Sequence, residues 1–173
     1  IDAIKYASDN DVLVIAAAGN ESKDLDSLSN DNYPNDQFFN KNEFSDTFIK
    51  VGASSINLDE NFIAYFSNYG KINVDIFAPG VDIYSTVPND KYKFQSGTSM
   101  ASPVVSGVAS LIMSYFPKLS AKKVKEIILE SGIDIDVKIG NLGGNKHFRE
   151  YSKSGKLVNA YNALILASRS KKK

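Results

Sequence analysis

The sequence contains no cysteine and only one histidine, His147. The absence of cysteine excludes a disulfide scaffold, a thiolate zinc site and a cysteine nucleophile. Because a single imidazole cannot form a histidine cluster, a metal site in this chain would have to be built from carboxylate and carbonyl oxygens. Any nucleophile that the chain carries is therefore not a thiol.

The chain also lacks an excess of charge and a long apolar run. Twenty basic and twenty acidic residues cancel, and phosphate binding needs a clustered positive excess, so a nucleic-acid partner is not expected. No apolar run reaches the roughly 20 residues that span a bilayer, so no membrane partner is expected either. Only residues 169–173 are strongly basic, and we expect them to be a solvated tail.

What the sequence does contain suits one packed domain. The 173 residues are 43% hydrophobic and 11% aromatic, which is enough apolar material for a core. We see no internal repeat and predict one domain over residues 1–168, followed by the basic tail. Residues 1–10 have the pattern of the end of a helix and begin with Ile1 rather than Met, so we expect further residues upstream in a parent protein.

The order of the predicted elements indicates an α/β fold. The run VLVIAAA at 12–18 has no polar alternation, which is typical of a strand covered on both faces in a parallel sheet. Buried strands joined to helices by short connections predict a three-layer α/β domain with a parallel sheet. The other predicted elements are strands at 48–53 and 74–77, a hairpin of 83–86 with 92–95, helices from Ser99 to Pro117, from Ser120 to Gly132 and at 157–167, and an irregular segment at 133–155.

The stretch KFQSGTSMASPVV, residues 93–105, places Ser99 at the start of a predicted helix. Unpaired N–H groups and the positive end of the helix dipole surround such a hydroxyl, and they would stabilise an oxyanion formed when it attacks a carbonyl. Gly97 permits a tight turn before the helix. An ordinary helix-capping serine is the alternative. Ala101 stands where the α/β-hydrolase elbow needs glycine, so that fold is not indicated.

Several motifs resemble the subtilisin-like serine peptidase family. SGTSMASPVVSGVASLI, residues 96–112, resembles the nucleophile motif of that family. In the order expected for the family, VLVIAAAGNE at 12–21, FIKVGASS at 48–55, FSNYG at 66–70 and DIFAPGVDIYST at 75–86 resemble further segments. GKLVNAYNAL at 155–164 resembles the closing helix. The resemblance thus covers nearly the whole chain and implies an incomplete subtilisin-like fold, its C-terminal part only.

This resemblance implies roles for particular residues. Ser99 would be the nucleophile, and the side chain of Asn20 would join the Ser99 backbone N–H in holding the oxyanion. The substrate would be a protein or peptide, and no cofactor would be required for the chemistry. Family resemblance alone implies export from the cell. The residues implied to line the substrate pocket are Ala16, Ala17, Ala18 and Gly19 as one wall and Glu21 at its mouth.

Structural calcium is common in the family, so the resemblance allows a calcium ion in the acidic segment at 21–46. The spacing there fits no EF-hand loop, and the composition favours a solvated acidic loop.

The segments that carry the base and its orienting carboxylate in this family are absent. His147 follows Ser99 in no matching context, which indicates a surface loop, and Asp75 and Asp82 match no aspartate motif. We therefore interpret the chain as the C-terminal part of a serine endopeptidase domain that is nearly inactive alone. A non-catalytic peptidase-like module is the alternative, and a fragment that self-associates through an open sheet edge is a third reading.

Overall fold

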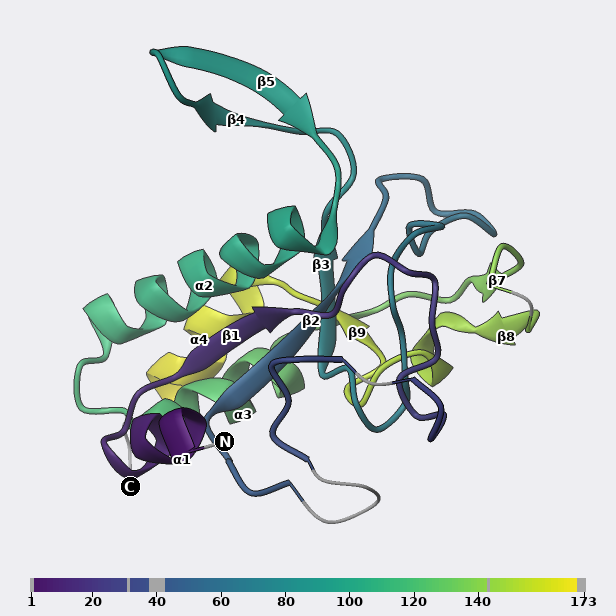
Figure 1. The fold of residues 1–173 in the computed structure, drawn as a ribbon. Coiled ribbons are helices and arrows are strands. Elements are labelled where there is room, and N and C mark those ends of the chain that lie inside the picture. Colours follow the sequence, from purple (N-terminus) through teal and green to yellow (C-terminus); the bar gives the residue numbers. More distant parts are fainter. Residues whose placement is uncertain (1, 31, 38–42, 143, 171–173) are drawn as a thin grey trace.

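The computed structural model describes residues 2–30, 32–37, 43–142 and 144–170, and it forms an α/β fold around a mainly parallel sheet (Figure 1). The strand order is β1-β2-β3-β9-β6, in which β1, β2, β3 and β9 are parallel and β6 is antiparallel to β9. The predicted parallel sheet is confirmed. Its strands are β1 (Val14–Ala17), β2 (Phe48–Ser54), β3 (Ile76–Pro79), β6 (Ile133–Asp134) and β9 (Lys156–Leu157).

β2 lies between β1 and β3 and is buried along its whole length, as its mainly apolar and small residues predict. Lys50 is the one charged residue in this strand. β1 differs because it lies at the edge of the sheet, where the structure describes no strand on its outer side. Leu13, Val14 and Ile15 are accordingly only half-buried. The expectation that 12–18 is covered on both faces is therefore wrong for most of this strand. Backbone groups on this outer edge of β1 have no partner strand among the described residues.

Three helices pack together against one face of the sheet: α2 (Thr98–Tyr115), α3 (Ala121–Ser131) and α4 (Ala160–Ser170) (Figure 1). Alternate β2 residues, Ile49, Val51 and Ala53, share one buried cluster with residues of all three helices. The buried Ala101 and Ala109 keep α2 thin on the side that meets the sheet. The first helix of the chain, α1 (Asp2–Asp9), precedes β1 and contains no buried residue.

Irregular segments cover the opposite face, around a second buried cluster that includes Ala18, Phe62, Phe77 and Phe148. Gly52 explains how this face packs against β2. A Cβ added to Gly52 would lie 2.4 Å from the ring of Phe77, so only glycine lets that ring lie against the strand.

Several predicted boundaries are corrected by the fold. The third strand is β3 at Ile76–Pro79 rather than 74–77, and the closing helix begins at Ala160 because Leu157 pairs with Phe77 in the sheet. α4 continues to Ser170, past the predicted start of the basic tail, and residues 171–173 lie outside the described part. The segment 133–155 contains regular pieces in addition to β6, namely β7 (Lys138–Ile139), β8 (Lys146–His147) and the 3-10 helix η1 (Phe148–Glu150).

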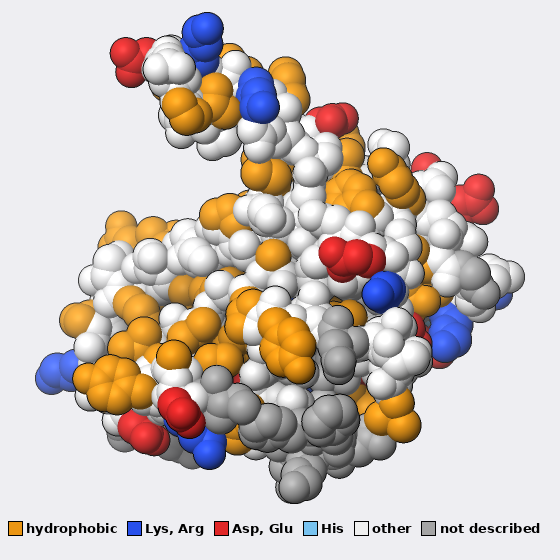
Figure 2. Space-filling view, in the orientation of Figure 1, with side chains coloured by type: hydrophobic (Ala, Val, Ile, Leu, Met, Phe, Trp, Pro, Cys, Tyr) orange, Lys and Arg blue, Asp and Glu red, His pale blue; other side chains and the backbone are white. Residues whose placement is uncertain are grey.

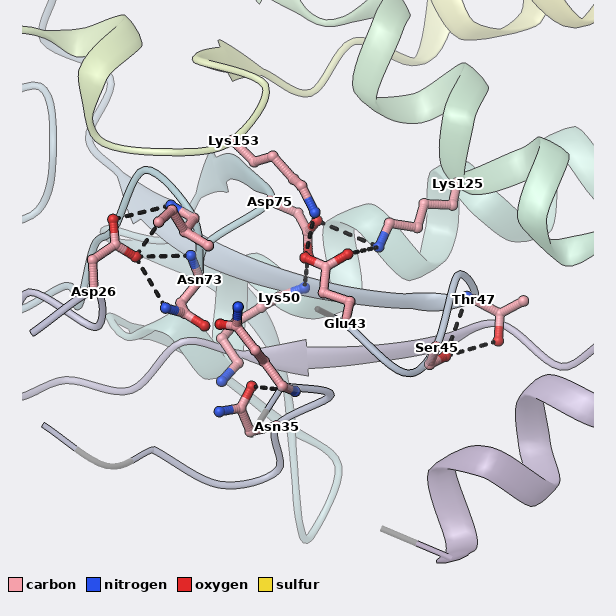
Figure 3. A network of polar contacts seen from close by, with 12 residues as sticks. Asp26, Asn35, Glu43, Ser45, Thr47, Lys50, Asn73, Asp75, Lys125 and Lys153 are labelled. Atoms are coloured by element: carbon pink, nitrogen blue, oxygen red, sulfur yellow. Dashed lines mark hydrogen bonds and ion pairs between the residues drawn. The ribbon is translucent and has the colours of Figure 1, made fainter. Parts of the chain in front are cut away.

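A cluster of buried charges lies at the end of the sheet where strand β3 begins (Figure 3). Asp75 accepts the Lys50 N–H at 2.7 Å, and the Lys125 Nζ lies 3.5 Å from the Asp75 carboxylate and 3.9 Å from that of Glu43. Burial lowers the pKa of Lys50 to about 8 and raises the pKa of Asp75. The contacts of Asp75 are therefore structural. They lie at the opposite end of the sheet from the start of α2.

Candidate active site

The candidate site forms where β1, β2 and β3 end and α2 begins. Gly80 follows β3 and ties these ends together, because its N–H donates to Ser54 O at 2.9 Å and its carbonyl accepts the Gly97 N–H at 2.8 Å. A Cβ on Gly80 would lie 2.7 Å from the Ala53 Cβ and 2.8 Å from Gly97 O. Glycine at this position therefore lets the first turn of α2 approach the carboxyl ends of the strands.

Thr98, the first residue of α2, holds the side chain of Asn20. The backbone N and the hydroxyl of Thr98 each donate to Asn20 Oδ1 at 2.9 Å, and the Thr98 hydroxyl accepts the Gly19 N–H at 3.1 Å. Thr98 is fully buried. Because a backbone N–H can only donate, the Asn20 atom that faces it must be the oxygen, which leaves Nδ2 on the other side of the amide.

Two hydrogen-bond donors lie close to Gly97. A Cβ added at Gly97 would lie 3.5 Å from Asn20 Nδ2, and 3.7 Å from both the backbone N of Ser99 and the Met100 sulfur. Neither donor has an acceptor in the part of the chain that the structure describes. The Ser99 side chain is exposed, one residue into the helix. An oxygen with negative charge placed there could accept two hydrogen bonds and would face the positive end of α2.

The residues implied to form the substrate pocket lie along β1 and just beyond it. Ala16 and Ala18 are buried, Ala17 and Gly19 are half-buried, and Glu21 is exposed. Glu21 Oε2 accepts a hydrogen bond at 2.6 Å from the side chain of Asn68, so this carboxylate is held in place by the protein. Asn68 and Thr98 are the two contacts that we did not single out from the sequence, although both lie in motifs that carry the family resemblance.

A cavity of about 120 Å³ lies beside Ser99, between the start of α2 and the hairpin of β4 (Ile83–Val87) and β5 (Lys91–Gln95). Figure 2 shows this hairpin standing away from the rest of the molecule. The confirmed hairpin leads directly into the candidate site, since only Ser96 and Gly97 separate β5 from α2. The residues lining the cavity are Ile83, Ser85, Thr86, Val87, Lys93, Gln95, Ser99, Met100 and Pro103.

The other titratable candidates do not meet Ser99. His147 lies in β8, half-buried, with Nδ1 3.5 Å from Asp136, and Figure 1 shows the β7–β8 hairpin apart from the start of α2. His147 is thus in a short strand rather than in the surface loop expected from the sequence. The exposed Asp82 accepts a hydrogen bond from the Ser96 hydroxyl. Within the described ranges, no side chain hydrogen-bonds to the Ser99 hydroxyl.

The acidic segment contains several carboxylates that could in principle bind a metal ion. Among the residues placed by the structure, no group of three or more His, Cys, Asp or Glu side chains could hold a metal ion. Asp26 instead accepts hydrogen bonds from the N–H groups of Ile72 and Asn73. We assign no calcium ligands in this part of the chain. None of the helices placed in the structure is both long and apolar enough to pass through a membrane.

Residues 1–157 match the sequence profile of the Subtilase family, which is more than half of the chain. The chain therefore belongs to the subtilase family, as the motifs around Asn20 and Ser99 predict.

Curated relatives include Subtilisin DY of Bacillus licheniformis, which is 40% identical over 123 residues, 71% of this chain and 40% of that protein. The Major intracellular serine protease of Bacillus subtilis strain 168 is 39% identical over 125 residues, 72% of this chain and 35% of that protein. The chain thus spans less than half the length of these relatives.

Solved structures with the same fold include that of the subtilase cytotoxin SubAB, with a TM-score of 0.74 and 25% identity. The alignment covers 98% of this chain and 53% of that one. The prenylagaramide maturation protease PagA has a TM-score of 0.71 and 29% identity, covering 95% of this chain and 54% of its own. The chain therefore corresponds to about half of each structure, which confirms the predicted incomplete subtilisin-like fold.

Proposed function

We propose that this chain is the nucleophile-bearing part of a serine endopeptidase, with Ser99 as nucleophile and Asn20 as a donor to the oxyanion. The observation that carries this proposal is the pair of donors, Asn20 Nδ2 and Ser99 N, which both lie within 4 Å of the point where a Cβ at Gly97 would stand. Membership of the subtilase family and relatives named as serine proteases support the same chemistry.

In the proposed reaction, the Ser99 hydroxyl oxygen forms a bond to the carbonyl carbon of the peptide. The hydroxyl proton passes to a base supplied by upstream sequence, and the carbonyl oxygen becomes an oxyanion between Asn20 Nδ2 and Ser99 N. The C–N bond then breaks, the leaving amine takes a proton, and water hydrolyses the ester left on Ser99. Asn20 suits this role because a neutral amide stabilises the negative charge as it develops.

We also propose that the β1 end forms one wall of the pocket for the side chain before the scissile bond. Ala16 to Gly19 are small, and Glu21 is exposed next to them. A carboxylate at the mouth would favour basic side chains in addition to apolar ones. The test uses two peptides that differ only in having Lys or Leu at this position, with the wild-type parent enzyme and its Glu21→Gln variant. In Glu21→Gln, the rate of cleavage should fall for the Lys peptide and not for the Leu peptide.

The main test is fluorophosphonate labelling of the parent protein that includes its upstream segments, with the adduct located by mass spectrometry. We expect an adduct on Ser99 that is lost in Ser99→Ala and kept in Ser110→Ala, because Ser110 is exposed on the same helix. In Asn20→Ala, hydrolysis of a peptide substrate should slow by ~10²–10³. A folded parent without an adduct would favour the alternative, a non-catalytic peptidase-like module.

The isolated 173-residue chain is expected to be nearly inactive, because no base contacts the Ser99 hydroxyl among the residues that the structure describes. A rate of ester hydrolysis near that of an intact peptidase would contradict this. We further propose that the isolated chain self-associates, since the outer edge of β1 has no partner strand in the described structure. A strictly monomeric mass in solution would contradict that proposal.

Export from the cell remains a prediction, to be tested by fractionation. Relatives are named both intracellular and cell-wall-associated.

A further inference from the structure

Asn68 is a buried polar residue that joins the β2–β3 connection to the chain around Asn20. Asn68 is 1% exposed, and its side chain makes four hydrogen bonds. Its Nδ2 donates to Ala18 O at 2.8 Å and to Glu21 Oε2 at 2.6 Å. Its Oδ1 accepts the N–H groups of Glu21 at 3.1 Å and Lys23 at 2.9 Å. Every partner lies within three residues of Asn20 in the sequence.

The backbone of Asn68 adds a fifth bond, in which its N–H donates to Gly19 O at 3.0 Å. Asn68 thus holds the chain on both sides of Asn20, whereas Thr98 holds the Asn20 side chain itself. Gly19 fits between these contacts because its φ of +98° is in the left-handed region and because a Cβ would lie 2.5 Å from Asn68 Nδ2. Glycine before Asn20 therefore lets Asn68 approach this close to the chain.

We propose that Asn68 is a positioning residue of the active site: it fixes the backbone from Ala18 to Lys23 so that the Asn20 amide meets the developing oxyanion. This inference rests on the proposed function of Ser99 and Asn20. Stabilisation of an oxyanion depends on donors that are held in place before the charge appears, and a misplacement of about 1 Å can cost ~10² in rate.

A primary amide suits this position for a chemical reason. One end of Asn68 must donate to a carbonyl and a carboxylate, while the other end must accept two N–H groups. A carboxylate can accept but cannot donate when it is ionised, and an alkyl side chain can do neither. The same Nδ2 contacts Glu21, so Asn68 also sets the position of the pocket-mouth carboxylate relative to the oxyanion donor.

The first variant is Asn68→Ala in the parent protein that contains the upstream segments. We expect kcat for a peptide substrate to fall by between ~10-fold and ~10²-fold with KM nearly unchanged, because the loss arises in the transition state. Asn73→Ala is the matched control. Its Nδ2 donates to Leu25 O and to Asp26, so it supports a neighbouring loop without contacting the residues around Asn20. A loss of kcat no larger than that of Asn73→Ala would overturn the proposal.

The second variant, Asn68→Asp, gives a pH signature that lost packing alone would not produce. It places a carboxylate against that of Glu21 and removes the donor to Ala18 O. Two carboxylates this close cannot both ionise readily. The rate relative to wild type should therefore recover as the pH falls and the pair takes up one proton. Adding Glu21→Gln should let the amide at position 21 donate to the new carboxylate at position 68 and should raise the rate of Asn68→Asp. If the rate neither recovers at low pH nor rises with Glu21→Gln, the proposal is contradicted.

Hydrogen exchange separates failure of this inference from failure of the proposed function. In the same parent protein, Asn68→Ala should speed exchange of the Glu21 and Lys23 amides, which donate to Asn68 Oδ1. Unchanged exchange at both amides would overturn the positioning role whatever the activity. If wild-type protein instead takes no fluorophosphonate on Ser99, the proposed function fails, and the catalytic role of Asn68 fails with it even where exchange speeds up.

Discussion

Replacing Asp36 by asparagine should stabilise the protein in a pH-dependent way. Asp36 is only 7% exposed, and its side-chain Oδ2 has no hydrogen-bond partner in the described structure. Burial, followed by the nearby Glu43 carboxylate, raises the pKa of Asp36 from 3.8 to about 6. Asn is close to Asp in shape and carries no charge, so Asp36→Asn removes the cost of ionising a buried group.

The sign of the effect follows from the two protonation states. Folded protein holds the Asp36 proton more tightly than the unfolded chain does, so the stability associated with this proton is fully present below pH 3.8 and is lost as the pH rises through about 6. Each unit of pKa corresponds to ~1.4 kcal/mol. With a discount for partial contact with solvent, Asp36→Asn should raise the unfolding free energy by about 2 kcal/mol above pH 6 and leave it nearly unchanged at pH 3.5.

Urea unfolding of both proteins at pH 3.5, 5, 6 and 8 would measure this difference, with Asp134→Asn as a control. Asp134 is exposed in β6, so its substitution removes the same formal charge from the surface. A difference between Asp36→Asn and wild type that stays constant across this pH range would refute the reasoning. So would a pH-dependent gain of equal size in Asp134→Asn.

Gly52→Ala should cost about 1–3 kcal/mol, because the new Cβ would lie 2.4 Å from the Phe77 ring. Gly107→Ala in α2, where no atom lies within 4 Å of an added Cβ, should be neutral or stabilising by up to ~1 kcal/mol. Thermal unfolding compares the two, and equal effects would contradict the packing argument. Lys125→Met removes the cation that lies 3.5 Å from the buried Asp75 carboxylate and should cost about 3 kcal/mol at pH 7. Burial raises the pKa of Asp75, so the loss of unfolding free energy in Lys125→Met should be smaller at pH 4 than at pH 7. Denaturant unfolding measures this loss, and an equal loss at both pH values would exclude the charge effect.

Patterns along the chain were sufficient to predict the parallel sheet, the β4–β5 hairpin and the long helix after Ser99. These predictions succeed where the side chains decide the local structure, as in the mainly apolar β2 and in the end of α2 just before Pro117. The order of the motifs along the chain also predicted the family. Boundaries failed where a long-range contact decides them, since Leu157 is in a strand only because it lies beside Phe77.

The sequence by itself determined which chemical groups the site can use: one hydroxyl at a helix start and one carboxamide after a strand, with no thiol. Only the tertiary structure decided how they meet. Asn20 and Thr98 are 78 residues apart in sequence yet joined by hydrogen bonds, and Asn68 reaches the same loop from a third segment. Such pairings depend on where parallel strands end in space, because distant segments come together only when the sheet aligns their carboxyl ends.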